Sequence, residues 1–294
     1  VRIRVHATAL NRADLLQRRG GYPAPFGVPA DIPGLEFAGE IDAVGPLVAT
    51  LRPGQRVFGI VGGGAYAEYL ITTERMAVTI PDNLDWLQAA AVPEVFMTAH
   101  DALRQAHFVA GERVLVHAVG SGVGTAAVQL VRALGGTSYG TARSPEKLTG
   151  ARDLGLDVGL AAASWADELA ASNHQVDVIL DFVGSSYLGA NLNALAPRGR
   201  LVLIGLLGGA TAEVDLSVIQ RKRLQIIGTV LRSRPLEEKI VVTQAFAKQV
   251  VPLLARGAVR PVLHRVFDLQ AAAAAQQYME QNANFGKIVL RVTA

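Results

Sequence analysis

The stretch that decides the fold is Arg113-Val-Leu-Val-His-Ala-Val-Gly-Ser-Gly-Val-Gly-Thr-Ala-Ala-Val-Gln-Leu-Val131. It opens with a short apolar run, Val114 to Ala118, of the kind that is buried in a parallel sheet. The segment Gly122-Val-Gly-Thr-Ala-Ala127 then fits the pattern G-x-G-x-x-A. In that pattern the first Gly allows a tight turn, the second lets the backbone approach a pyrophosphate, and the small third residue lets helix pack on strand. The stretch therefore predicts a strand, a phosphate-binding turn and a helix whose N-terminus faces the phosphate.

Helices and strands alternate along the chain from about Asp85. The first helix is expected to run from Thr125 to Leu134 and to end at Gly135-Gly136. Together with the strand before it, the later apolar runs make about six parallel strands, the size of a complete dinucleotide-binding sheet. These later strands are expected at Thr137–Ala142, Val176–Val183, Arg200–Gly205 and Leu224–Val230. The fold class is predicted to be α/β, with a doubly wound parallel sheet.

The first part of the chain has a different pattern, rich in Gly, Pro and short β-type runs. It predicts an all-β, barrel-like domain, and the closing strand-helix-strand segment is expected to return to it. A long helix from Leu236 to Leu254, kinked at Pro252, is expected before that return. The predicted organisation is residues 1–88 for the N-terminal part of the barrel domain, 89–232 for the nucleotide-binding domain and 233–294 for the return. The predicted strands of the first part are Val1–His6, Glu36–Val44, Arg56–Ile60 and Ala65–Ile71.

The composition is that of a globular protein, with 50% hydrophobic and 18% charged residues in 294. A net charge of +3 is small for this length, so neither nucleic acid nor a membrane surface is implied as a partner. The absence of cysteine argues against a disulfide scaffold, a thiolate zinc site and thiol catalysis, and it fits a reducing, cytoplasmic location. No signal peptide is visible, and because the chain starts at Val1 in mid-strand, the native N-terminus is expected to be missing.

The end of the second sheet strand indicates which dinucleotide binds. NAD-binding forms of this fold place a carboxylate there, on the ribose 2′-hydroxyl. Here Arg143, Ser144 and Lys147 stand near the tip, and they offer a guanidinium, a hydroxyl and an ammonium to a 2′-phosphate. The alternative is an ordinary exposed helix start in which Ser144 only caps the helix. The prediction is NADPH as the cofactor.

The substrate site is inferred by elimination. The six histidines are scattered without ligand spacing, and neither G-x-S-x-G nor H-E-x-x-H occurs. Hydride transfer to an electron-poor acceptor needs only position, polarity and exclusion of water from the protein. Phe26 and Phe96 are candidate walls of an apolar slot, although Phe96 equally fits the core, and Asp14 equally fits a helix cap. The candidate polar residues of the slot are Asn11, Asp14, Tyr22 and Thr98.

Several motifs together resemble the zinc-free, zeta-crystallin-like quinone oxidoreductases of the medium-chain dehydrogenase/reductase superfamily. The resemblance covers nearly the whole chain. The motifs that carry it are Ala9-Leu-Asn-Arg-Ala-Asp14, Gly34-Leu-Glu-Phe-Ala-Gly-Glu-Ile41, Ala89-Ala-Ala-Val-Pro-Glu94, His117-Ala-Val-Gly-Ser-Gly-Val-Gly-Thr125, Val230-Leu-Arg-Ser-Arg234 and Asn284-Phe-Gly-Lys-Ile-Val-Leu290.

The resemblance implies a GroES-like barrel domain and a Rossmann domain, with the nicotinamide between them. It implies that Tyr22 and Asn11 line the nicotinamide pocket, and that Arg143 and Lys147 reach the 2′-phosphate. Zinc-dependent relatives have a Gly-His-Glu triplet whose residues include a zinc ligand. The matching residues here are Gly34-Leu35-Glu36, so the resemblance implies that no metal is bound. The family often has a Tyr or His after the third strand, near the adenosine, and this chain has Ala162 at that position. The remaining cofactor contacts implied are Ser121, Gly122, Val123 and Gly124 at the pyrophosphate, and Gly205, Leu206, Leu207, Leu231 and Asn284 around the nicotinamide.

The leading functional hypothesis is an NADPH-dependent quinone reductase that forms a homodimer. An NADPH-dependent enoyl or 2-alkenal reductase would use the same cofactor residues, so it stays open as the alternative within the enzymes. A non-enzymatic, NADPH-binding structural or regulatory protein is the alternative from another class.

Overall fold

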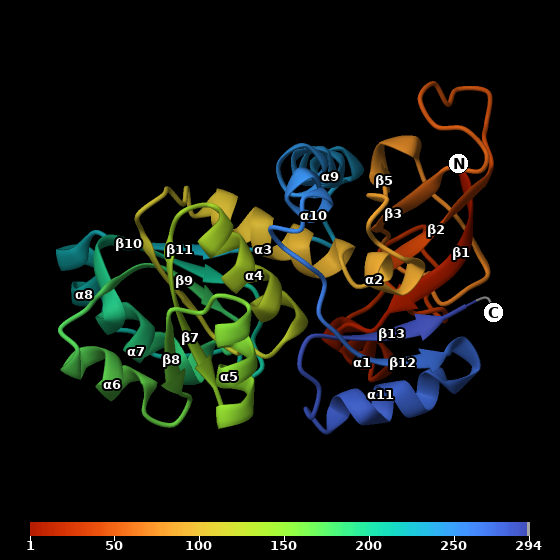
Figure 1. Ribbon diagram of the computed structural model, residues 1–294. Coiled ribbons are helices and arrows are strands. Elements are labelled where there is room, and N and C mark those ends of the chain that lie inside the picture. The colour runs from red at the N-terminus through yellow and green to blue at the C-terminus, as the bar shows by residue number, and fades with distance from the viewer. Residues whose placement is uncertain (293–294) are drawn as a thin grey trace. The chain divides into compact units, whose positions relative to one another are not determined.

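A computed structural model of the chain describes residues 1–292 and divides into two compact units. Unit 1 consists of residues 1–97 and the chain from Leu231 onward, and unit 2 consists of residues 98–230 (Figure 1). Residues 89–97, which the sequence analysis grouped with the nucleotide-binding domain, are therefore grouped with unit 1. Helix α3 (Pro93–Gln105) contains the boundary between the two units.

Unit 2 alternates strands and helices from the end of α3 onward (Figure 1). Its elements are β6 (Arg113–Val116), α4 (Gly122–Ala133), β7 (Thr137–Ala142), α5 (Pro145–Asp153), β8 (Val158–Ala161), α6 (Trp165–Ala171), β9 (Val176–Asp181), α7 (Ser185–Ala194), β10 (Leu195–Leu203), α8 (Leu216–Lys222) and β11 (Gln225–Gly228).

The six strands of unit 2 form one sheet in the order β11-β10-β9-β6-β7-β8, and every neighbouring pair is parallel. The chain leaves β6 toward one edge and returns to β9 on the other side, so the strand order reverses between β6 and β9. Ligands of such sheets bind beyond the carboxyl ends of the strands at this reversal. The core includes Leu115, Ile179 and Leu201, all fully buried on strands of the sheet. The predicted α/β fold class with a Rossmann sheet is confirmed.

Unit 1 is built on a seven-stranded sheet in the order β12-β13-β1-β2-β3-β5, with β4 paired to β1. The C-terminal strands thus join the sheet of the N-terminal ones, through β13 against β1. The elements are β1 (Arg2–Ala9), α1 (Arg12–Arg18), β2 (Glu36–Ala43), β3 (Arg56–Ile60), β4 (Tyr69–Ile71), η1 (Glu74–Met76), β5 (Ala77–Thr79), α2 (Trp86–Ala90), α9 (Leu236–Gln249), α10 (Val251–Ala255), β12 (Leu263–Asp268), η2 (Leu269–Ala271), α11 (Ala272–Glu280) and β13 (Lys287–Arg291).

Two predicted elements of unit 1 differ from the structure. The strand expected from Ala65 begins only at Tyr69, because the N–H groups of Ala65 and Tyr66 bond the Gly34 and Pro33 carbonyls in a turn instead of a strand ladder. The long helix expected from Leu236 is two helices that meet at Val250, since Pro252 has no N–H with which to continue the first. Within residues 1–292, no helix is both long and apolar enough to cross a membrane.

Candidate active site

The glycine-rich turn of unit 2 connects β6 to α4. Ser121 is the N-cap of α4, and its Oγ accepts a hydrogen bond of 3.0 Å from the Gly124 N–H. A Cβ atom at Gly124 would lie 2.5 Å from the Ala118 carbonyl oxygen, so any side chain there collides with the backbone of the turn. Gly124 is therefore required for the turn itself, and Gly122 and Val123 present their N–H groups at the helix N-terminus beside it. The turn fits a dinucleotide pyrophosphate.

The end of β7 carries the three polar residues expected to face a 2′-phosphate. Arg143 is exposed, and Ser144 is the N-cap of α5 without making a side-chain capping bond. The alternative role of Ser144 as a capping side chain is thus not seen, and its hydroxyl is left for other contacts. Lys147 lies against the phosphate turn, because a Cβ at Gly120 would be 2.6 Å from its Cδ. Lys147 therefore borders the turn, and Arg143 and Ser144 follow β7, the strand next to β6. Their guanidinium, hydroxyl and ammonium groups fit a phosphorylated ribose.

The point where the strand order reverses is organised by a buried carboxylate at the end of β9. Asp181 has no exposed surface, and it accepts hydrogen bonds from the Val183 and Gly184 N–H groups and from the Asn191 amide. Asn191 Oδ1 lies 2.7 Å from His117 Nε2, and burial lowers the pKa of His117 to about 4, so its ring is neutral. His117 is therefore a structural residue.

The remaining predicted cofactor residues of unit 2 lie after β10. The N–H of Gly205 bonds the Asp181 carbonyl at 3.2 Å, which holds this segment to the end of β9. Leu206 and Leu207 are exposed apolar side chains. Thr98, on α3, is half-buried.

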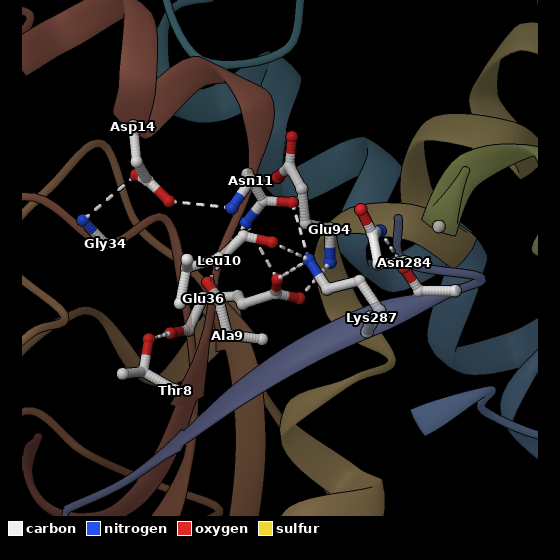
Figure 2. Close-up of polar contacts among 12 residues, drawn as sticks. Thr8, Ala9, Leu10, Asn11, Asp14, Gly34, Glu36, Glu94, Asn284 and Lys287 are labelled. Carbon is white, nitrogen blue, oxygen red and sulfur yellow. Dashed lines mark hydrogen bonds and ion pairs between the residues drawn. The ribbon is translucent and has the colours of Figure 1, made fainter. Parts of the chain in front are cut away.

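A buried ion pair forms the centre of the candidate site in unit 1 (Figure 2). Lys287 Nζ lies 2.7 Å from Glu36 Oε1, and the two side chains are 4% and 0% exposed. The ammonium also donates to the Leu10 carbonyl at 2.6 Å and to Asn11 Oδ1 at 2.7 Å. All three N–H donors of Lys287 are thereby used, so this lysine has no proton left for a ligand.

Asn11 and Asp14 are also held inside this network. The Asn11 amide nitrogen donates to Glu36 Oε1 at 2.8 Å and to the Ala9 carbonyl at 3.3 Å. Asp14 has no exposed surface and accepts from the Asn11 N–H, the Gly34 N–H and the Tyr66 hydroxyl. The alternative considered from the sequence, Asp14 as the N-cap of a helix over residues 15–18, is wrong, because α1 begins at Arg12 with Asn11 as its N-cap and Asp14 is the N3 residue of the capping box. Both side chains therefore hold the site together from inside unit 1.

Glu94 lies in the first turn of α3, beside the ion pair. Its backbone N–H donates to Glu36 Oε2 at 2.8 Å, while its own side chain extends away from Glu36 and Lys287 (Figure 2). Burial, with the negative charge of Glu36, raises the pKa of Glu94 to about 8. Within residues 1–292 the Glu94 carboxyl group makes no hydrogen bond or ion pair. Glu94 is therefore protonated at neutral pH.

Tyr22 is held by an arginine that the sequence analysis did not single out as a site residue. The Arg232 guanidinium lies 4.9 Å from the centroid of the Tyr22 ring and donates to the Tyr22 carbonyl at 3.0 Å. It also donates to the Gly62 carbonyl and to Gln17 Oε1, and it is nearly buried. Burial, with the negative charge of Glu94, raises the pKa of Tyr22, and the Arg232 charge acts in the opposite direction.

The other predicted site residues of unit 1 differ in how far they are buried. Asn284 is half-buried and donates to the Gly286 carbonyl at 2.8 Å, just before Lys287 (Figure 2). Leu231 is buried next to Arg232. Phe96 is core, at 1% exposure, whereas Phe26 is fully exposed on the loop after Tyr22.

The residues around Glu36 do not suit a zinc ion. Zinc sites in proteins use sulfur, imidazole nitrogen and carboxylate ligands, and here an ammonium lies among the oxygen atoms of Glu36, Asn11 and Leu10. In the part of the chain that the structure describes, no group of three or more His, Asp or Glu residues could hold a metal.

Sequence reasoning missed Lys287, Glu94 and Arg232 as site residues, although all three lie in motifs that it quoted. The signal was a charged side chain inside an apolar context. Lys287 opens the run Lys-Ile-Val-Leu of a buried strand, and Glu94 follows Ala-Ala-Ala-Val-Pro. Charged residues in such positions are almost never buried without a partner, which makes each a candidate for a specific role.

We expect Gly124→Ala to disrupt the phosphate turn and Gly189→Ala to leave it intact. Both glycines lie in helices of unit 2, but a Cβ at Gly124 would lie 2.5 Å from the Ala118 oxygen and one at Gly189 would meet nothing within 4 Å. Gly124→Ala should lose about 2 kcal/mol or more of unfolding free energy through overpacking, and with it the binding of NADPH. Gly189→Ala should gain about 0.5–1 kcal/mol. Urea unfolding and NADPH fluorescence titration check both; equal stabilities would contradict the steric argument.

We expect Lys287→Met to destabilise unit 1 strongly, because it leaves the Glu36 carboxylate buried without its partner. Breaking such a pair costs about 3–5 kcal/mol. The control is Arg4→Met, which breaks the 3.2 Å surface pair of Arg4 and Glu40, whose side chains are 45% and 32% exposed, and which should cost less than about 1 kcal/mol. Equilibrium unfolding in urea measures both. If Lys287→Met lowers the free energy of unfolding by no more than Arg4→Met does, the buried ion pair is not a major source of stability.

Comparisons with known proteins agree with this geometry. Residues 1–82 match the family described as alcohol dehydrogenase GroES-like domain, and residues 122–250 match the family described as zinc-binding dehydrogenase. A quinone oxidoreductase of Pseudomonas aeruginosa is 35% identical over 99% of this chain and 90% of its own length. The polyketide synthase GfsB of Streptomyces halstedii is 37% identical over 99% of this chain, which spans only 5% of that protein's length.

Among solved structures, the chain is similar to a quinone oxidoreductase and to an enoyl reductase. The quinone oxidoreductase of Thermus thermophilus, solved also in complex with NADPH, superimposes with a TM-score of 0.86 at 32% identity, over 99% of this chain and 91% of that one. The CurK enoyl reductase superimposes with a TM-score of 0.85 at 28% identity, over 100% of this chain and 91% of that one. The predicted family is confirmed: the chain belongs to the medium-chain dehydrogenase/reductase superfamily, in the branch that contains the quinone oxidoreductases.

Proposed function

We propose that the protein is an NADPH-dependent quinone oxidoreductase that works without zinc. The observation that carries this proposal is the Lys287 ammonium held among the oxygens of Glu36, Asn11 and Leu10. The ammonium and these oxygen atoms do not form a metal site, and Lys287 has no free N–H to donate to a substrate. They therefore do not activate an unreactive carbonyl or alcohol for hydride transfer. A quinone is already electron-poor, and it needs mainly to be positioned beside a hydride donor.

The cofactor side of the proposal rests on unit 2. The N-terminus of α4, with Ser121 to Gly124, holds the pyrophosphate by N–H groups and the helix dipole. Arg143, the Ser144 hydroxyl and Lys147 hold the 2′-phosphate, and Gly205, Leu206 and Leu207 border the nicotinamide. When bound, the reduced nicotinamide supplies the hydride.

The acceptor side of the proposal rests on unit 1. Arg232 fixes Tyr22 through its carbonyl and its ring, so that this aromatic side chain is available to line a flat acceptor. Asn11 and Asp14 support the site from within unit 1, which also contains Leu231 and Asn284. This division of roles refines the expectation that Asn11 and Asp14 line the slot.

Two other functions stay open. The enoyl or 2-alkenal reductase is supported by the likeness to the CurK enoyl reductase and by the polyketide synthases among the relatives. It would use the same cofactor residues, since it differs only in the acceptor. An NADPH-binding protein without catalytic activity would keep the site of unit 2 and lack turnover.

We further propose a homodimer, with no nucleic acid or membrane partner. Strand β11 lies at the edge of the unit 2 sheet and exposes Ile226. An unpaired edge of this kind can be covered by the same edge of a second copy.

The experiment that tests the function is NADPH oxidation with 1,2- and 1,4-quinones, compared with 2-alkenals and an enoyl thioester. We expect kcat/KM for the best quinone to exceed that for the best enal or enoyl substrate by at least tenfold. The reverse order would make the enoyl reductase the correct function. Binding of NADPH without turnover of any acceptor would favour the non-enzymatic alternative.

The cofactor preference is tested by Arg143→Asp and Lys147→Asp, each of which puts a negative charge beside the 2′-phosphate. We expect each to weaken NADPH binding by about tenfold or more, equivalent to about 1.4 kcal/mol, and to leave NADH binding unchanged or improved. Arg221→Asp, in the exposed basic segment at the end of α8, is the matched charge control. Fluorescence titration with both nucleotides measures the effect. Unchanged NADPH affinity in both site variants would show that neither Arg143 nor Lys147 contacts the 2′-phosphate.

A further inference from the structure

The charged groups around Glu36 differ in what they can do for a reaction. Lys287 has all three donors bonded to protein oxygens. Glu36 accepts from Lys287, from Asn11 and from the Glu94 N–H. Lys287 has no free donor and Glu36 is held by three donors of the fold, so exchange of a proton with a ligand at either group would break bonds that hold unit 1 together.

The two other acidic groups of the cluster are also engaged. Asp14 accepts three hydrogen bonds and is inaccessible to solvent. The Tyr66 hydroxyl donates to Asp14, and burial together with this carboxylate raises its pKa well above the ordinary value. Burial raises the pKa of Asp14 as well, but Asp14 has no exposed surface and the Tyr66 hydroxyl is bonded to it, so neither group is placed to give a proton to a ligand.

Glu94 differs from all of these. Its backbone is fixed by the bond to Glu36, its side chain extends away from the ion pair (Figure 2), and its carboxyl group bonds to nothing in residues 1–292. The residue as a whole is half-buried. The charge of Glu94 also acts on the pKa of Tyr22, the proposed acceptor-lining aromatic residue.

We propose that Glu94 is the proton donor of the reaction. This inference rests on the proposed function, because reduction of a quinone needs one hydride and one proton. As the quinone takes a hydride, and so two electrons, from the reduced nicotinamide nucleotide, Glu94 gives its proton to the quinone oxygen. The carboxyl O–H bond breaks and the hydroquinone O–H bond forms, and solvent returns a proton to the Glu94 carboxylate.

The groups that face Glu94 keep the proton in place. Glu36 on β2 and Asp14 on α1 are negative and oppose its ionisation, while Lys287 on β13 and Arg232 favour it. Burial is the largest effect, and the balance raises the pKa of Glu94 to about 8. Tyr22 stays protonated, since its own pKa is raised. A general acid with a pKa near the working pH is protonated in most molecules and can still give up its proton readily.

The first test compares Glu94→Gln with wild type in initial rates of NADPH oxidation by the best quinone, from pH 6 to 10. We expect wild-type kcat to fall above about pH 8 as Glu94 ionises. Glu94→Gln should be about 10²-fold slower at pH 7, without that fall, while its affinity for NADPH is unchanged. Glu94→Asp should restore part of the rate and the fall above its own pKa. Glu238→Gln, an exposed carboxylate on α9, is the control and should match wild type.

The second test does not depend on catalysis. A carboxyl group whose pKa is raised in the folded state binds more protons folded than unfolded between about pH 4.5 and 8. Its contribution to stability therefore declines as pH rises through that window and is constant above it. The measured quantity is the urea midpoint of Glu94→Gln minus that of wild type, without nucleotide. This difference should rise between about pH 4.5 and 8 and be constant above about pH 8. The same difference for Glu238→Gln should not vary with pH.

The outcomes separate the two proposals. If wild type reduces quinones and Glu94→Gln does so within twofold, with the same pH profile, Glu94 is not the donor and the proposed function stands. A urea midpoint difference that does not vary between about pH 5 and 8 also overturns the role, because Glu94 would then be ionised at neutral pH. If wild type reduces no quinone, the proposed function fails, and the catalytic role of Glu94 fails with it.

Discussion

The buried ion pair of Lys287 and Glu36 is the interaction on which the arrangement of unit 1 depends. Lys287 opens β13 and Glu36 opens β2, and the pair also fixes Leu10, Asn11 and the start of α3. Burying two charges costs several kcal/mol for each ion unless each is paired and fully bonded. The segments that supply those bonds must therefore come together for either charge to be tolerated, and this condition ties the C-terminal strand to the N-terminal sheet.

Unit 2 depends on steric constraints and on one carboxylate. Gly124 allows the turn after β6 to pass the Ala118 carbonyl, and Asp181 gathers the N–H groups that follow β9. The two positions flank the reversal of strand order, where a parallel sheet opens for a ligand. Both fix backbone rather than side chains, which leaves the N–H groups of the turn and the exposed ends of the strands for the cofactor.

The sequence predicted the fold better than it predicted the roles of the site residues. The glycine-rich turn and the period of the strands are local signals, so unit 2 could be read almost element by element. The roles of Asn11 and Asp14 could not be read in this way, because they depend on Glu36, Gly34 and Lys287, which are distant in sequence. The break at Val250 was visible only as a proline, since the pattern on both sides is helical.

Charge balance explains why one acidic group in this cluster stays protonated. The groups acting on Glu94 are two cations, Lys287 and Arg232, and two carboxylates, Glu36 and Asp14. A third carboxylate would leave an excess negative charge in a nearly buried site, so the least engaged of the three keeps its proton. Glu36 and Asp14 each accept three hydrogen bonds from the fold. Glu94 accepts none within the described chain, so the hydrogen bonds that stabilise the fold also determine which carboxyl group remains available for chemistry.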